Sequence, residues 1–79
     1  MPYATVENGL IRSTHGRLHR AISRAQRVLA ARRLDDGAHM EVWRLRPEAE
    51  GERVRMQPIE HWGMSRLWDS RASQEGEQE

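Results

Sequence analysis

The feature that most constrains this chain is a helical repeat of apolar residues within residues 16–33. Apolar side chains recur there every three or four residues, which is the spacing of one face of an α-helix. They are Leu18, Ala21, Ile22, Ala25, Val28 and Leu29. Most other positions of the segment are polar or charged, so this helix must bury one face. In a chain of 79 residues without cysteine, that face has to pack on the rest of one small core.

The segment before this helix has the pattern of a short β-hairpin. Residues 3–7 and 10–12 flank Asn8-Gly9, a pair that tolerates the positive φ angles of a two-residue hairpin turn. The alternative is a single strand followed by a loop.

The segment after the helix has the pattern of a second hairpin. Residues 38–46 and 52–57 alternate in the manner of strands, and the polar stretch 47–51 between them is typical of a turn. Residues 59–68 are expected to form a short helix or an irregular apolar lid, interrupted at Gly63.

These elements predict an α+β fold, with a small antiparallel sheet of three or four strands and one long amphipathic helix packed on one face. We expect a single domain over residues 1–69. Residues 70–79 have Ala72 as their only apolar side chain, which predicts a disordered acidic tail.

Composition narrows the class of protein. No stretch approaches the roughly 18 consecutive apolar residues of a membrane span, which predicts a soluble, cytoplasmic protein without a membrane partner. All 13 basic side chains are arginine, and the formal net charge is only +1. The charges are nevertheless segregated, because residues 8–34 contain arginines and no acidic residue.

The chain offers two charged surfaces for a partner. With 100° per residue, four arginines of the predicted helix fall within a sector of about 80°; they are Arg17, Arg20, Arg24 and Arg27. The predicted tip of the second hairpin is acidic, with Glu48, Glu50 and Glu52, and such a tip could copy the spacing of nucleic-acid phosphates. Both patterns are also typical of solvated surfaces.

The sequence contains no pattern of a catalytic, cofactor or metal site. His15 and His19 have the spacing of two ligands on one helical face, but no third ligand lies near them and thiolates are absent. Neither a nucleophile elbow nor a phosphate-binding loop occurs. We therefore expect a binding protein without enzymatic activity, cofactor or metal.

Tryptophan is a further candidate for partner binding. The chain has 3 tryptophans and no phenylalanine, and tryptophan and arginine are enriched at interface hot spots. Trp43 is the most ambiguous, because its predicted strand has apolar residues on both faces. Trp62 and Trp68 would be the next candidates, and core packing is the alternative for all three.

Most of the chain resembles small anti-CRISPR proteins that act on type I, notably type I-C, systems. The resembling segments are Met1-Pro2-Tyr3-Ala4-Thr5-Val6, residues 23–30 and residues 40–44. The resemblance implies an inhibitor that binds the Cascade effector complex of a bacterial host and blocks recognition of target DNA, and it assigns no individual residue. The alternative is a small nucleic-acid-binding or regulatory protein that uses its arginine-rich helix. Oligomeric state is not predicted.

Overall fold

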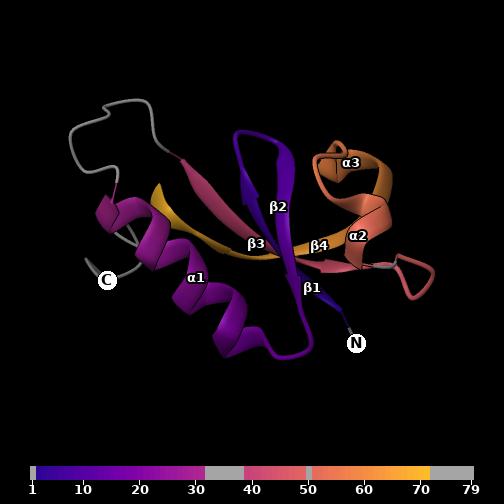
Figure 1. Ribbon diagram of the computed structural model, residues 1–79, viewed down its shortest axis with the longest axis horizontal. Coiled ribbons are helices and arrows are strands. Elements are labelled where there is room, and N and C mark those ends of the chain that lie inside the picture. Colours follow the sequence, from indigo (N-terminus) through magenta and orange to yellow (C-terminus); the bar gives the residue numbers. More distant parts are fainter. Residues whose placement is uncertain (1, 32–38, 50, 72–79) are drawn as a thin grey trace.

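The computed structural model describes residues 2–31, 39–49 and 51–71. In order, the elements in these ranges are β1 (Tyr3–Glu7), β2 (Leu10–His15), α1 (Leu18–Ala31), β3 (Met40–Leu45), α2 (Gly51–Val54), α3 (Ile59–Trp62) and β4 (Gly63–Asp69). The strands form one antiparallel 4-stranded sheet in the order β2-β1-β3-β4 (Figure 1). The predicted α+β fold is confirmed.

The N-terminal hairpin is formed as predicted. Asn8 and Gly9 have φ angles of 51° and 85°, which is the left-handed region that such a turn needs. The second strand is longer than expected and reaches His15. A register shift between Thr5 and Val6 marks a bulge in the pairing of β1 with β2.

Helix α1 covers one face of the sheet. It has 14 residues and lies inside the predicted range, while Arg32 and Arg33 lie outside the described residues. Ala21 and Ala25 are fully buried, and such small side chains let the helix axis approach the strands closely. A fully buried hydroxyl, Thr5 Oγ1, donates to the carbonyl oxygen of Ala21 at 2.8 Å and ties β1 to the helix.

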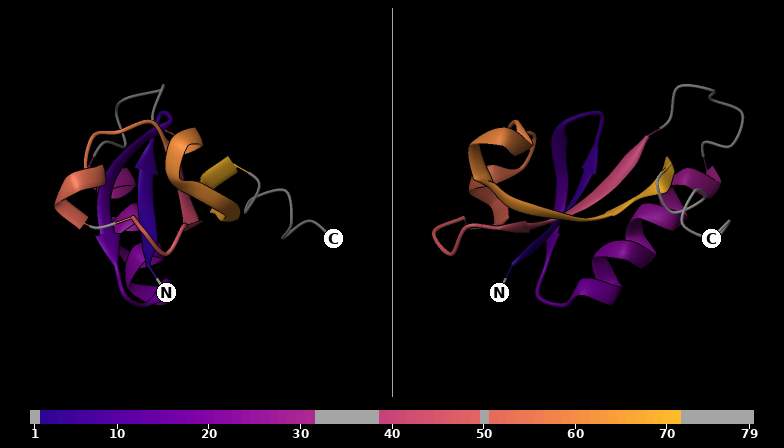
Figure 2. Two further views of the ribbon diagram at one scale, coloured as in Figure 1. Left: turned by 90° about the vertical axis from the view of Figure 1, so that its right-hand side faces the viewer. Right: turned by 180° about the vertical axis from the view of Figure 1, so that it is seen from behind.

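The opposite face of the sheet carries a second core, under the two short helices. Alternation along β1 and β3 sends Val42 toward α1, whereas Val6 and Leu45 point to the other face. There they pack with Val54 of α2 and Ile59 of α3. Figure 2 shows α1 and the two short helices on opposite sides of the sheet and at opposite ends of it.

The predicted second hairpin is wrong. Residues 52–57 form part of α2 and the turn after it, where Met56 has a φ of 67°, a value that no extended strand has. The antiparallel partner of β3 is β4 instead. The short helix expected near residue 59 is present as α3, but it ends at Trp62 and the chain continues as a strand.

The described residues continue past the predicted domain boundary at residue 69 to Arg71. Ser70 accepts a hydrogen bond from the backbone amide of Met40 at 3.2 Å, and the amide of Arg71 donates to Asp69. The remainder of the predicted tail, residues 72–79, lies outside the described residues. No helix within the described ranges is long and apolar enough to cross a lipid bilayer.

Candidate functional site

The exposed side of α1 carries three of the predicted arginines on one ridge. Arg20, Arg24 and Arg27 follow one another at helical spacings of four and three residues, which places neighbouring side chains on the same face. All three are exposed, because the buried positions of the helix are Ala21 and Ala25. The packing of the alanines on the sheet therefore orients the arginines toward solvent.

These arginines line a depression on the surface. Its volume is about 340 Å³, and it is lined by His15, His19, Arg20, Ser23, Arg24 and Arg27. His15 stands at the end of β2, so the depression lies where the sheet meets the helix. Every titratable side chain of this lining carries or can accept a positive charge.

A second depression of about 270 Å³ shares Arg24 with the first. It is lined by Thr5, Arg12, Ser13, Arg24, Val28, Arg55 and Met56. Arg12 comes from β2 and Arg55 from the turn after α2, so the positive charge continues beyond the helix. We call Arg12, Arg20, Arg24, Arg27 and Arg55 the cationic surface.

Among the described residues, Arg12 of the cationic surface is paired with an acidic side chain. Arg12 pairs with Glu7 at 3.4 Å, and Glu7 is almost buried. Within the part of the chain that the structure describes, none of the three arginines of α1 forms an ion pair with an acidic side chain. Helix α1 itself contains no acidic residue. Exposed guanidinium groups bind carboxylates or phosphates through charge-assisted hydrogen bonds.

His15 lines the same depression as these arginines. Partial burial lowers the pKa of His15, and the positive charges of Arg24 and Arg20 lower it further. Ser13 Oγ lies 2.9 Å from its Nε2 atom. Both effects on the pKa disfavour the protonated form of the imidazole.

The remaining predicted site residues lie apart from this surface. Arg17 stands in the bend before α1 and lines neither depression. Glu48 is exposed in the turn after β3, whereas Glu50 and the side chain of Glu52 lie outside the described residues. The acidic segment is not the tip of a hairpin, because Glu52 belongs to α2.

Trp43 is half-buried and packs against the core under α2 and α3. Its indole Nε1 donates to Glu41 Oε1 at 2.9 Å. Much of its surface is therefore used inside the fold, as the core-packing alternative expected.

Sequence reasoning missed two groups of residues that the structure brings together. Arg12 and Arg55 come near Arg24 because α1 and α2 both pack near β2, and no local pattern in the sequence indicates these contacts. A second group, His39, Glu41 and Asp69, comes together through the pairing of β3 with β4. The spacing of His39 and Glu41 on one strand face was the only local signal for it.

Comparisons with family models, with curated proteins and with solved structures gave no match for this chain.

Proposed function

We propose that this protein is a non-enzymatic inhibitor that binds a type I CRISPR effector complex in the bacterial cytoplasm through its cationic surface. The observation that carries the proposal is the position of Arg24, which lines both depressions and joins them into one positively charged surface. The resemblance to type I anti-CRISPR proteins supplies the class of partner.

The arrangement suits a protein partner that presents carboxylates. Arginine forks bind carboxylates through two parallel hydrogen bonds, and arginine is over-represented at interface hot spots. Depressions of about 340 and 270 Å³ have room for single side chains of a partner. A desolvated charge pair lost from such an interface costs about 2–5 kcal/mol, much of it from the stranded charge.

The cationic surface is favoured over mimicry of DNA by the acidic segment. The mimicry hypothesis requires a hairpin that projects its carboxylates toward the partner. Residues 52–57 do not form that hairpin. The three arginines of α1, by contrast, are held on one regular element at fixed spacing.

The direct test is retention of purified type I-C Cascade on the immobilised protein. We expect retention at micromolar concentration by the parent and its loss in R20E/R24E/R27E, because each reversal turns an attraction into a repulsion. The matched control is E48K/E50K/E52K, which changes the same number of charges elsewhere and should retain the complex. Circular dichroism confirms that each variant is folded.

Two results would remove parts of the proposal. Absence of retention by the parent protein removes the CRISPR effector as the partner. Retention by the arginine variant together with loss in the glutamate variant moves the contact to the acidic segment and restores mimicry.

A second candidate function is binding of nucleic acid by the same surface. The observation that favours it is the joint lining of one depression by three arginines and two histidines, all potential donors to phosphate. The formal net charge of only +1 weighs against it. Binding through phosphates predicts an affinity that falls steeply with salt, so a gel shift at low and moderate salt tests it. Absence of a shift at low salt eliminates this candidate.

A further inference from the structure

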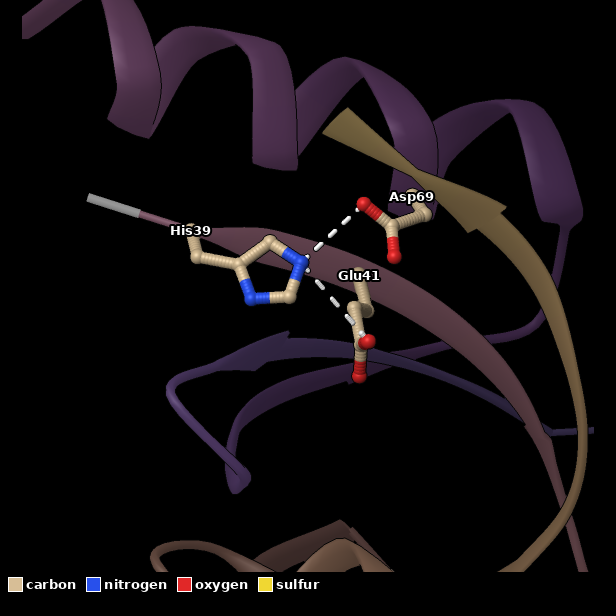
Figure 3. Close-up of side chains that lie close together, drawn as sticks. All are labelled: His39, Glu41 and Asp69. Atoms are coloured by element: carbon tan, nitrogen blue, oxygen red, sulfur yellow. Dashed lines mark hydrogen bonds and ion pairs between the residues drawn. The ribbon is translucent and has the colours of Figure 1, made fainter. Parts of the chain in front are cut away.

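The face of the sheet opposite α1 holds a cluster of potential metal ligands near the ends of β3 and β4. Glu41 and Asp69 are direct partners in the antiparallel pairing, and His39 precedes Glu41 by two residues, just before β3 begins. Figure 3 shows the His39 ring pointing at both carboxylates. His39 Nε2 lies 3.0 Å from Asp69 Oδ1 and 3.7 Å from Glu41 Oε2.

We propose that His39, Glu41 and Asp69 bind a divalent transition-metal ion, with Zn²⁺ as the ion that these donors match best. One donor atom from each of the three residues lies within 4.8 Å of the others. Donors at about 2.0–2.1 Å from a tetrahedral zinc ion are about 3.3 Å apart, close to the two distances from His39 Nε2. A small inward movement of side chains that are already adjacent would complete the site.

The chemistry of the donors selects the class of ion. An imidazole nitrogen with two carboxylates suits zinc and its neighbours in the first transition row, whereas magnesium and calcium prefer oxygen ligands alone. Three protein ligands leave a fourth position of a tetrahedral ion for water. Zinc needs the lone pair of Nε2, so the Nδ1-protonated tautomer of His39 is the binding form.

The supporting contacts hold two of the ligands in place. Trp43 Nε1 donates to Glu41 Oε1 and leaves Oε2 facing His39. The backbone amide of Arg71 donates to Asp69 Oδ1 at 2.7 Å, and Asp69 is only 9% exposed. Outer contacts of this kind orient metal ligands, and their loss typically weakens metal binding about 10–100-fold.

Arg66 shows that this pair of carboxylates attracts a cation. Its guanidinium lies 3.2 Å from Glu41 Oε2 and 3.1 Å from Asp69 Oδ2. Like charges directly opposite one another on paired strands repel, so a positive charge between them is stabilising. The Arg66 side chain is 51% exposed and can swing into solvent, which gives a divalent ion access to the two carboxylates.

Because Arg66 competes with a metal ion for the two carboxylates, the test has two variants with opposite expected effects on zinc affinity. We measure Zn²⁺ binding to the metal-free full chain by isothermal titration calorimetry, with Mg²⁺ as the comparison ion and Trp43 emission as a second readout. The parent should bind one equivalent of Zn²⁺ and no Mg²⁺. His39→Gln should weaken zinc binding by more than about 100-fold, beyond the loss of a single outer contact. Arg66→Gln should strengthen it about fivefold, because a nearby positive charge is removed.

His61→Gln is the matched control, because it removes an exposed histidine of α3 and should leave the affinity unchanged. Asp69→Asn is the second ligand variant and should repeat the loss seen with His39→Gln. Zinc binding that His39→Gln and Asp69→Asn leave intact, or that His61→Gln abolishes, would overturn the proposal. Absence of binding by the parent, or weaker binding by Arg66→Gln, would overturn it equally.

Discussion

Gly63 stands where α3 ends and β4 begins, with the indole ring of Trp43 directly against its Cα. A Cβ atom at this position would lie 2.7 Å from Trp43 Cε3 and 2.9 Å from the carbonyl oxygen of Ile59. The ring cannot easily withdraw, because its Nε1 is hydrogen-bonded to Glu41. A residue without a side chain is therefore required for close approach, although its φ of −77° is open to any residue.

We expect Gly63→Ala to lower the free energy of unfolding by about 1–3 kcal/mol, the usual cost of overpacking. Gly16→Ala is the matched control, since a Cβ there would meet nothing within 4 Å, and its effect should stay within about 0.5 kcal/mol. Urea unfolding followed by tryptophan fluorescence measures both. Equal stabilities of the two variants would contradict the packing of Trp43 on Gly63.

His15 makes stability depend on pH. Its pKa in the folded protein lies below the ordinary value of 6.5, because of burial and then of Arg24 and Arg20. The unfolded chain therefore binds the proton more readily, and this group's contribution is lost as the pH falls through 6.5 toward the folded value.

We expect the parent to lose more stability than His15→Gln between pH 7.5 and pH 5.5, measured by urea unfolding. Because the variant keeps the other histidines, comparing it with the parent removes their contribution to the pH dependence of stability. A loss in the variant as large as that in the parent would show that folding does not lower the pKa of His15.

At the scale of elements, the sequence predicted those elements that are formed by residues close together in the chain. The period of α1 and the Asn8-Gly9 turn were legible because helices and two-residue hairpins are formed by neighbours in sequence. Strand β4 was hidden, because its apolar residues recur at helical intervals. Register shifts in the pairing of β3 with β4 displace the alternation that would have revealed a strand. Residues 52–57 gave the opposite error. They were predicted to form a strand, but Val54 is buried as part of helix α2.

The residues of the candidate site also fall into those that could be predicted from local sequence and those that could not. The three arginines of α1 could be predicted from spacing alone, since the helix places them together. Arg12 and Arg55 could not, because tertiary packing brings them near Arg24. His39 and Asp69 are 30 positions apart in sequence, and only strand pairing unites them.

The packing of α1 on the sheet depends on small side chains at its centre. Ala25 is fully buried, whereas Ala30 is exposed on the same helix. Ala25→Leu should lower the free energy of unfolding by about 1–3 kcal/mol by forcing helix and sheet apart. Ala30→Leu adds the same side chain and should change stability by less than about 0.5 kcal/mol. Thermal unfolding compares them, and a similar loss in both would contradict close packing of the helix.

At the scale of the whole molecule, the sheet separates two groups of charged side chains. The cationic surface lies on the side of α1, and the carboxylates of Glu41 and Asp69 lie on the far face of the sheet. A thin layer of strands separates them, so α1 is not neutralised by these acids. This arrangement lets one small domain present a positively charged contact surface to a partner, as the proposed function requires.

The most direct measurement of that function is target-DNA binding by type I-C Cascade, followed by gel shift in the presence of the protein. We expect the parent protein to abolish the DNA shift when in excess over Cascade, and R20E/R24E/R27E to leave the shift intact. An unchanged shift with the parent protein, or inhibition by the folded arginine variant equal to that of the parent, would contradict inhibition through the cationic surface.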